Sequence, residues 1–551
     1  MLPELPRTYY LDNVQTLFAH VGRVYADILD PDMLAFLDDF ARLEADARKL
    51  CIRLLNRRHE RFRRGKLDYP EIADLDAALD ALAAADFVEL DGEIDAAELL
   101  SLFTRAELLA AHGDDADLKK LRRPQLEAVL LDAADADYFQ RLRTDERLIQ
   151  LLRGDQYLRC QMLFFGNLNQ SMTDFVLRDL GLYQYESYTI DAEHRPYRDA
   201  VEIEQHWLTY LAESLFELID RQDPAALLEL CAALPDDIEA RAPAWRRGER
   251  LRYEIARQLE RLGEFDSALD LYRQCQLPPS RERIARIFDR RGEHRQAFDI
   301  CAQIATDPFD EAEMQFAASF ASRLARRHGF DTPPLVDAIN QQHQPEIIDL
   351  ELEPRDSVEL AVAAHLDARA AGERCFYLEN HLFTGVLGLL IWDAVFAPLP
   401  GAFFNPFQYR PSDFYAHDFC DNRREQLQAT WDSLRDNDDI LRLVKSRWQQ
   451  KHGLMNPLVN WQYLDLEVIE LALERIDHAH WRAIFERILA DLRNNRAGFP
   501  DLLHFPADGG YCLVEVKGPG DSLQKNQLRW MQYFARHGIA HRLARVTWRA
   551  S

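Results

Sequence analysis

The pattern of apolar and polar positions divides the chain into a helical majority and a C-terminal part that contains strands. Amphipathic helical patterns fill residues 1 to about 90, for example over 33–37 and 75–85. From about residue 355 the pattern becomes mixed, and close to the C-terminus it alternates as in a β-strand. We therefore predict a multidomain, mainly α protein with a C-terminal α/β domain.

The middle of the chain, between about residues 245 and 330, repeats itself. Small and apolar residues around a glycine recur 29 positions later: Ala256, Leu259, Gly263, Ala268, Leu271 and Tyr272 correspond to Ala285, Phe288, Gly292, Ala297, Ile300 and Cys301. This spacing is typical of stacked antiparallel helix pairs, similar to tetratricopeptide (TPR) repeats, whose usual role is packing or partner binding. We expect a linker after the repeats, over 343–354.

A β-hairpin is expected near the C-terminus, with strands at 502–505 and 511–517. The Ala-Asp-Gly-Gly sequence between them is a favourable turn. Side chains alternate along a strand, which places Glu515 and Lys517 on the same face. Asp501 begins the partner strand, so Asp501, Glu515 and Lys517 are expected to converge at one end of the hairpin.

Three further elements complete the expected domain. A helix that contains Glu379 is expected to run on through the apolar segment 386–396. After the hairpin, a helix from about 522 to 536 presents Gln527 near the same end, and 541–548 has the pattern of a closing strand. Nearby, Asp421, Arg423 and Arg424 are expected to form a solvated turn without a catalytic role.

Two carboxylates and a lysine at one end of a hairpin have a definite chemical use. Carboxylates bind hard divalent cations such as Mg²⁺, which accept phosphate oxygens as further ligands. Such ions polarise a phosphate and lower the pKa of an attacking water, and a lysine can orient that water or offset the developing charge. The backbone carbonyl of Val516 is a candidate further ligand. The alternative is a surface ion pair between Glu515 and Lys517, which the apolar character of the strand disfavours.

The composition limits how such a site could meet nucleic acid. The chain has 551 residues and a net charge of −27, and 47% of its residues are hydrophobic, which excludes wholesale disorder. An acidic chain cannot attract a polyanion through its overall field, so local basic patches must do so. The eight cysteines form no C-x-x-C pair, which argues against a zinc module or a disulfide framework and favours a reducing compartment.

No targeting segment or membrane span is expected. The N-terminus lacks a cationic region followed by an apolar one. The longest apolar stretch, 382–404, is interrupted by Asp393, Pro398 and Pro400. We therefore predict a soluble, intracellular protein with no membrane partner.

Two stretches reverse the acidic balance locally. The first basic stretch contains Arg53, Arg57, Arg58, Arg61, Arg63, Arg64 and Lys66. The second basic stretch contains Lys119, Lys120, Arg122 and Arg123. It follows a capping-box pattern at 104–107 and precedes Pro124 at an expected helix start, and this pair of short helices resembles a SAP domain, a small DNA-binding hairpin. Both stretches are interpreted as phosphate contacts, and the alternative for each is a solvated helix face.

The motif residues resemble one nuclease family over nearly the whole chain. Residues 496–502, 514–519 and Gln527 are similar to the VRR-NUC branch of the PD-(D/E)XK nucleases, and more narrowly to the Fanconi-associated nucleases. The segments 379–383 and 388–393 match the Glu-bearing helix of that family.

The resemblance implies roles for individual residues. The carboxylates of Glu379, Asp501 and Glu515 and the carbonyl of Val516 would hold two Mg²⁺ or Mn²⁺ ions, Lys517 would be the catalytic lysine, and Gln527 would support the site. Arg493 falls where eukaryotic members carry an arginine that grips a 5′-phosphate. The basic residue that precedes the motif glutamine in the family is Asn526 here, with Lys525 one place earlier, which weakens the expectation of tight 5′-phosphate recognition.

The resemblance also implies an organisation in four parts: an N-terminal helical DNA-binding region (1–92), a SAP-like domain (93–225), TPR-like repeats (226–345) and a VRR-NUC nuclease domain (350–551). The implied activity is a 5′-flap endonuclease with 5′-to-3′ exonuclease action in interstrand crosslink repair. The expected partners are 5′ flaps and crosslinked DNA. A bacterial member in the cytoplasm at the nucleoid is expected, without the ubiquitin-binding zinc finger of longer relatives.

Two other functions stay open on the sequence. A Holliday-junction resolvase is the first, because simpler VRR-NUC proteins cleave four-way junctions, although resolvases usually act as two-fold dimers without fused helical domains. A non-catalytic repair scaffold with TPR-like repeats is the second. The complete set of Glu379, Asp501, Glu515 and Lys517 argues against a scaffold.

Overall fold

The computed structural model describes residues 8–57, 59–113, 115–133, 135–144, 146–170, 175, 180–240, 242–340 and 345–549. These residues form two compact units. The first comprises the residues up to Leu182 together with Arg198–Ala200, and the second comprises Tyr183–Tyr197 and the chain from Val201 onward. No helix in the described part of the chain is long and apolar enough to cross a membrane.

The first unit is mainly helical. Its helices are α1 (Tyr9–Tyr25), α2 (Pro31–Arg42), α3 (Ala45–Leu55), α4 (Leu75–Ala84), α5 (Ala96–Ser101), α6 (Arg105–His112), α7 (Arg123–Ala133), α8 (Ala136–Arg143) and α9 (Gly154–Phe165), with short 3₁₀ turns η1 (Arg64–Lys66) and η2 (Leu118–Lys120). A small antiparallel sheet of order β1-β3-β2 joins them, formed by β1 (Arg61–Arg63), β2 (Val88–Leu90) and β3 (Leu148–Leu151). The expectation of helix alone over the first 90 residues was therefore incomplete.

Local capping chemistry sets several helix starts in this unit. Asp30 accepts a hydrogen bond from the N–H of Met33 at 2.8 Å, and Pro31 follows at the start of α2. At α6, the hydroxyl of Thr104 and the carboxylate of Glu107 form the reciprocal capping box that the sequence predicts. The pattern at 104–107 is thus confirmed as a helix start.

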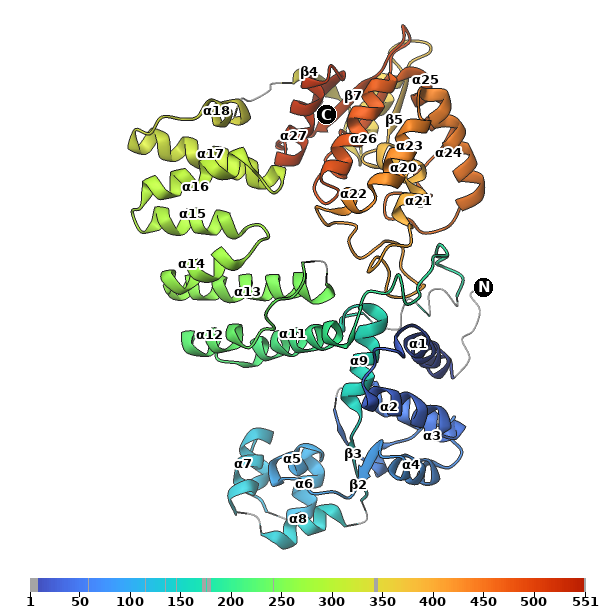
Figure 1. Ribbon diagram of the computed structural model, residues 1–551, viewed down its shortest axis with the longest axis vertical. Helices are drawn as coiled ribbons and strands as arrows, with labels where there is room; N and C mark the ends of the chain where they lie inside the picture. Colours follow the sequence, from blue (N-terminus) through green and yellow to red (C-terminus); the bar gives the residue numbers. More distant parts are fainter. Residues whose placement is uncertain are drawn as a thin grey trace. The chain divides into compact units, whose positions relative to one another are not determined.

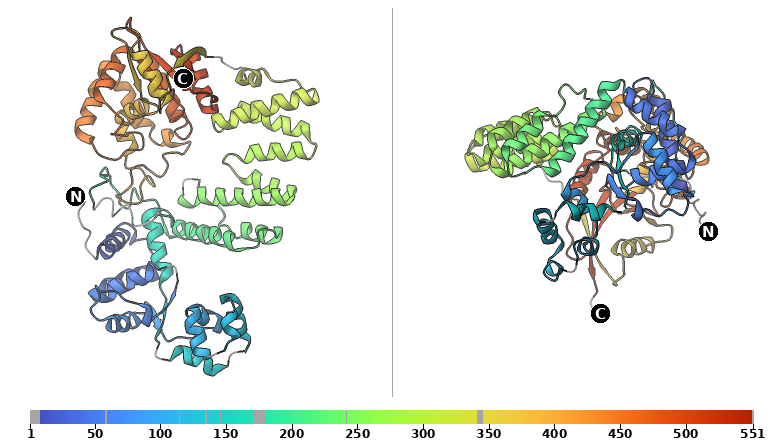
Figure 2. Two further views of the ribbon diagram at one scale, coloured as in Figure 1. Left: turned by 180° about the vertical axis from the view of Figure 1, so that it is seen from behind. Right: turned by 90° about the horizontal axis from the view of Figure 1, so that it is seen from below.

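The second unit begins with a stack of antiparallel helices (Figures 1 and 2). They are α11 (Ala200–Leu218), α12 (Pro224–Ala232), α13 (Pro243–Leu262), α14 (Phe265–Gln274), α15 (Ser280–Arg290), α16 (His294–Thr306), α17 (Glu311–His328) and α18 (Pro334–Asn340). Gly263 and Gly292 have φ values of +89° and +79° in the tight turns after α13 and α15, where a side chain would be strained. The repeating alanines, such as Ala256 and Ala285, are completely buried. The predicted helix pairs are confirmed.

The packing of α11 in the helix stack explains why the boundary between the two units lies at the start of this helix. Ala212 and Phe216 of α11 are buried together with Leu227 and Leu230 of α12 and with Leu251 of α13. Helix α11 therefore belongs to the core of the stack. The division falls within the expected SAP-like domain of 93–225 instead of at its end.

The rest of the second unit is an α/β domain around a five-stranded sheet. The strands are β4 (Glu346–Leu352), β5 (Arg374–Tyr377), β6 (Leu502–Phe505), β7 (Cys512–Lys517) and β8 (His541–Trp548), in the order β4-β8-β7-β6-β5. β8 is parallel to β4 and β7, whereas β6 is antiparallel to β5 and β7. The hairpin and the closing strand are confirmed, with the first residue of β7 one position later than predicted.

Helices cover the sheet and connect its strands. They are α19 (Val358–Asp367), α20 (His381–Leu390), α21 (Trp392–Val395), α22 (Phe419–Asn422), α23 (Arg424–Ser433), α24 (Asn437–Lys451), α25 (Leu466–Arg475), α26 (His478–Ala490) and α27 (Lys525–Arg536). Ala361 and Val362 of α19 share a core with Val514 and Val516 of β7 and Ala544 of β8. This packing buries the valine face of β7, as the alternation predicts.

The expected linker over 343–354 was wrong for Glu346–Leu352. This segment forms β4, at an edge of the sheet, and pairs over its full length with residues 542–548 of β8. Acidic and apolar residues alternate from Ile348 to Leu352, and Asp349 and Glu351 are exposed, as is common for charged residues on an edge strand. A polar edge strand and a polar linker look alike in composition, which is why the sequence misled us.

The expected solvated turn at 421–424 was wrong for Arg423, which is completely buried. Its guanidinium contacts the carboxylate of Asp413 at 2.7 and 2.9 Å and donates to the carbonyl of Ala394 at 2.8 Å. A bidentate partner and a carbonyl satisfy the donors well enough to allow burial. Asp421 and Arg424 are exposed, as expected for a solvated turn, and they pair with each other.

Candidate active site

Backbone hydrogen bonds bring three segments together around Asp501. The carbonyl of Asp501 accepts from the N–H groups of Leu378 at 3.0 Å and Glu379 at 3.1 Å, which tie the turn after β5 to the start of β6. The carboxylate of Asp501 accepts from the N–H of Val516 on β7 at 2.8 Å. Asp501 thus sits at the junction of β5, β6 and β7, and the predicted convergence at this end of the hairpin is confirmed.

Glu379 is placed by a turn, not by a helix, which corrects our expectation. It lies between β5 and α20 with a φ of +42°, a conformation that is rare and strained for residues with a side chain. The hydrogen bond to Asp501 holds it there, and the side chain of Asn380 accepts from the N–H of Phe499 at 3.1 Å. The hydroxyl of Tyr377 donates to the Glu379 carboxylate. This strained turn aims an acidic residue toward the same sheet edge as Asp501.

Glu515 and Lys517 form an ion pair inside the protein. The Lys517 ammonium lies 2.8 Å from Oε1 of Glu515, whose side chain is completely buried. The other oxygen, Oε2, is buried and has no hydrogen-bond partner among the described residues. The pair proposed as the alternative therefore exists, but it is buried and leaves Oε2 without a partner, which is costly for a charged group unless another cation is bound.

The electrostatics of the site favour the binding of a positive charge. Burial raises the pKa of Asp501 to about 6, and the charges of Glu359 and Glu379 add to this rise, while the Val516 N–H and Lys517 oppose it. Burial also raises the pKa of Glu515 to about 8, with a further rise from Asp501 that Lys517 only partly offsets. Crowded carboxylates with raised pKa values are typical of sites that bind metal ions or protons.

Glu359 is an acidic residue of this site that the sequence analysis missed. It lies in the first turn of α19, and the hydroxyl of Ser357, the N-cap, donates to its carboxylate at 2.7 Å. Its charge raises the pKa of both Asp501 and Glu515. An acidic residue in a first helical turn is common for reasons of capping and helix dipole. No local signal distinguishes Glu359 from such a residue, so only the fold could identify it.

The residues present fit a hard divalent cation. The buried Oε2 of Glu515, which has no partner among the described residues, and the raised pKa values of Asp501 and Glu515 are typical of a carboxylate site that binds a cation. The residues able to hold a metal are Glu379, Asp501, Glu515 and the Val516 carbonyl. When bound, such a cation would polarise a phosphate and lower the pKa of an attacking water.

Gln527 has a structural contact in α27. Its side chain accepts from the N–H of Gln524 at 2.9 Å, and the side chain of Gln524 caps the helix in return. The predicted helix therefore begins at Lys525, three residues later than expected. The supporting role of Gln527 in catalysis stays a prediction.

The first basic stretch is spread over the end of α3, β1 and η1, so it is not a single helix face. Acidic partners engage most of its cations: the contacts are Arg53 with Glu71, Arg61 with Glu98, Arg63 with Glu107 and Glu146, Arg64 with Asp76, and Lys66 with Glu107. Arg57 lies 5.9 Å from the ring of Phe62 and 5.7 Å from that of Tyr69. Arg58 lies outside the described residues. The proposed phosphate contacts of Arg57, Arg58 and Arg61 stay predictions.

The second basic stretch is more exposed. Lys119, Lys120 and Arg122 are exposed around η2, and Lys120 lies 2.8 Å from Asp117. Arg123 differs from them, because it pairs with Glu127 at 2.7 Å and donates to the carbonyls at the end of α5 at 3.2 Å. Arg123 therefore holds α7 against α5, whereas the other three cations are available to solvent.

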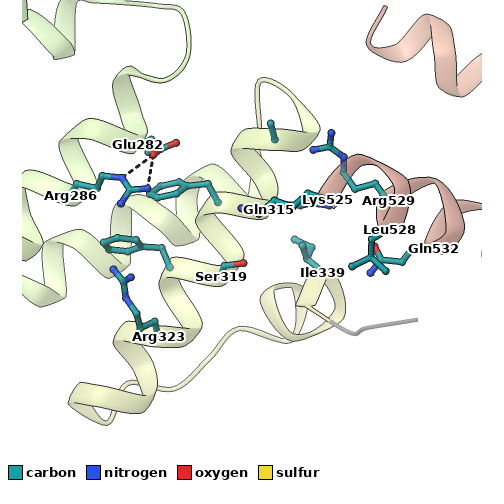
Figure 3. Close-up of a pocket in the computed structure, with 13 residues that line it drawn as sticks. Glu282, Arg286, Gln315, Ser319, Arg323, Ile339, Lys525, Leu528, Arg529 and Gln532 are labelled. Atoms are coloured by element: carbon teal, nitrogen blue, oxygen red, sulfur yellow. Dashed lines mark hydrogen bonds and ion pairs between the residues drawn. The ribbon is translucent and has the colours of Figure 1, made fainter. Parts of the chain in front are cut away.

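Arg493 and Lys525 are both exposed. Lys525 lines a cavity of about 620 Å³ together with Arg529 of α27, Arg286 of α15 and Arg323 of α17 (Figure 3). Lys525 was predicted from the sequence, whereas the three arginines were not. They come from three separate helices, so no local pattern connects them.

Comparisons with known proteins agree with this geometry. A family model described as "VRR-NUC domain" matches residues 435–548, and one described as "FAN1, HTH domain" matches residues 8–89. The Fanconi-associated nuclease 1 homolog of Pseudomonas aeruginosa is 35% identical over 563 residues, which cover 99% of this chain and 97% of that protein. The homolog of Arabidopsis thaliana is 23% identical over 611 residues, which cover 98% of this chain and 67% of that protein.

A solved structure is similar over its whole length. The crystal structure of paFAN1 bound to 2nt 5′flap DNA with gap has a TM-score of 0.82 and 34% sequence identity, and the match covers 100% of both chains. Such identity and coverage, together with the VRR-NUC match, identify the family. This chain belongs to the Fanconi-associated nucleases, as a bacterial-type member with a VRR-NUC domain.

Proposed function

We propose that this protein is a metal-dependent, structure-specific DNA nuclease that cleaves DNA with a 5′ flap. The observation that carries the proposal is the buried carboxylate cluster of Glu379, Asp501 and Glu515, in which Oε1 of Glu515 lies 2.8 Å from Lys517 and Oε2 has no hydrogen-bond partner among the described residues. The similarity to a relative crystallised with 5′-flap DNA supports the choice of substrate. Mg²⁺ or Mn²⁺ is the expected cofactor, because an all-oxygen donor set favours hard cations.

The residues of the chain would divide the work of hydrolysis. The Val516 N–H fixes the orientation of the Asp501 carboxylate, and the turn at Glu379 brings a further carboxylate to the same edge. A divalent cation held by these groups would supply the Lewis acid and the activated water. Lys517 remains beside Glu515, where its ammonium can orient the attacking water or stabilise negative charge on the phosphorane oxygens.

The finer parts of the function are also proposals. We infer a 5′-to-3′ exonuclease activity alongside the endonuclease, a role in interstrand crosslink repair, and action on the bacterial nucleoid. These rest on membership of the family alone. The basic residues in the first unit would hold duplex DNA through phosphate contacts, which orient the substrate without reading its bases.

Side-by-side cleavage of branched substrates tests the proposed polarity. We expect cuts a few nucleotides beyond the junction, within the duplex and on the strand with the 5′ flap, independent of sequence, and poor cleavage of 3′ flaps and intact four-way junctions. Removal of the 5′-phosphate should change the rate only modestly, with Arg493 and Lys525 as the residues to substitute. End-labelled substrates with Mg²⁺ or Mn²⁺ provide the measurement. A preference for four-way junctions, with paired symmetric nicks, would favour the resolvase, and no cleavage of any substrate would favour the scaffold.

Charge reversal tests the two basic stretches. Reversing Arg57, Arg58 and Arg61 to glutamate, or Lys119, Lys120 and Arg122, should weaken DNA binding and flatten its salt dependence, because each lost phosphate contact lowers the log–log slope by about 0.9. Arg123 is left unchanged in the second set, since its reversal would also disturb the contact with α5. Arg61 pairs with Glu98 of α5, so a variant that reverses only Arg57 and Arg58 is measured beside the triple variant.

The control for these variants carries charge reversals at Arg273 and Arg295, two exposed residues of the helix stack. It tests whether added negative charge alone weakens binding. Binding isotherms at several salt concentrations give the slope. If both sets keep the wild-type affinity and slope, the two stretches are solvated surfaces and the phosphate contacts lie elsewhere.

A further inference from the structure

Three metal-ligating side chains meet at one end of the helix stack, away from the carboxylate site in sequence. Asp289 lies near the end of α15, His294 is the first residue of α16, and His328 is the last residue of α17. Each offers one ligand atom, and the three atoms lie within 4.8 Å of one another. The tight turn at Gly292 places the end of α15 beside the start of α16.

The contacts among the three side chains leave one nitrogen unused. Nδ1 of His294 lies 2.9 Å from the Asp289 carboxylate, and the rings of His294 and His328 are stacked with centroids 3.8 Å apart. Nε2 of His328 is buried and has no hydrogen-bond partner among the described residues. A buried nitrogen without a partner is unfavourable in a histidine that serves only for packing.

The donor set decides which cation such a site would select. Two imidazoles and one carboxylate suit borderline transition metals, of which Zn²⁺ is the usual one, and not Mg²⁺, which prefers oxygen alone. Three protein ligands leave a fourth position for water. The side chains of Asp289 and His294 are 21% and 28% exposed, so solvent can reach that position.

A neighbouring cation opposes metal binding here. Arg323 of α17 lies 3.8 Å from the Asp289 carboxylate and competes with a metal for it. Arg323 also lines the cavity of Figure 3. If a metal bound the Asp289 carboxylate, the Arg323 guanidinium would lose that partner and would contact only the cavity.

We propose that Asp289, His294 and His328 form a second metal site, selective for Zn²⁺ or a similar transition cation, that joins α15, α16 and α17. It is independent of the nuclease function, because none of its residues belongs to the carboxylate cluster. A cation bound there would link three consecutive helices of the stack and stabilise the folded state in proportion to its occupancy.

Zinc binding to the full-length, metal-stripped protein tests this site. Millimolar Mg²⁺ is kept in the buffer to occupy the carboxylate cluster, and zinc is measured by equilibrium dialysis with elemental analysis. We expect the affinity to fall at least about tenfold in His294→Gln and in His328→Gln, because even the loss of a ligand's outer partner costs that much. Two control variants should bind as much zinc at this site as the wild type. They are His59→Gln, which replaces an exposed histidine outside the cluster, and Asp501→Asn.

A second variant keeps the test valid if the histidine variants fold poorly. Arg323→Gln removes the competing cation, so it should tighten zinc binding, an effect that unfolding cannot produce. Substitution of Co²⁺ for zinc should give the strong visible absorption of a four-coordinate site with nitrogen ligands, and this absorption should be lost in His328→Gln. The proposal is overturned if the zinc affinity is unchanged in both histidine variants. It is also overturned if Asp501→Asn loses all zinc binding, because the zinc then binds at the carboxylate cluster.

Discussion

Replacing Asp501 with asparagine is expected to lower the rate of DNA cleavage by on the order of 10³-fold or more, because the variant removes a charge from the group that holds the catalytic cation. Alanine at Asp501, Glu515 or Lys517 should abolish cleavage in the same way. DNA binding should change little, since phosphate contacts come from elsewhere on the protein. Single-turnover cleavage and a binding isotherm for each variant provide the measurements, and chelation of divalent cations should abolish wild-type activity as well.

The structure supplies two controls for this experiment. Asp349→Asn removes a carboxylate from the exposed edge strand of the same sheet and should leave cleavage unchanged. In the absence of metal, Asp501→Asn should also be at least as stable to heat as the wild type. The reason is that the buried carboxylate of Asp501 is repelled by the charges of Glu359 and Glu379, and asparagine removes this repulsion. Cleavage that survives in Asp501→Asn or Asp501→Ala would refute the site.

The apparent affinity for Mn²⁺ is expected to rise about tenfold per pH unit between pH 6 and pH 8, and to level off above pH 8. The physical reason is competition between protons and the cation. Burial raises the pKa of Glu515 to about 8 and that of Asp501 to about 6. Binding of the cation therefore releases one proton between pH 6 and pH 8, and two protons below pH 6. Titration with Mn²⁺ at a series of pH values measures the affinity without involving the attacking hydroxide, which would also raise the cleavage rate.

The same shifts predict how stability depends on pH. A carboxyl group with a raised pKa in the native state binds its proton more tightly there than in the unfolded chain. The metal-free protein should therefore lose stability as the pH rises from the ordinary carboxyl range to about 8. Glu515→Gln should remove the dependence of Mn²⁺ affinity on pH above pH 6. An affinity that is constant between pH 6 and pH 8 in the wild type would contradict the assignment of a buried, protonated Glu515.

Local patterns in the sequence determined the elements that carry the site. The alternation in β7, the turn before it and the helix that follows depend on neighbours along the chain, so their periods and turn residues are visible in one segment. The helix pairs at 256–301 and the capping box at Thr104 were predictable for the same reason. The convergence of Asp501, Glu515 and Lys517 followed from strand geometry alone.

The tertiary structure decided the features that depend on distant partners. Glu379 occupies a strained turn because its N–H binds the carbonyl of Asp501, 122 positions away in the sequence. Glu359 joins the site because α19 packs on the sheet. The segment Glu346–Leu352 forms a strand because it pairs with β8. The partners of the first basic stretch are likewise distant acidic residues. Composition and periodicity report the preference of a segment, whereas burial, pairing and charge compensation depend on which segments meet in the fold.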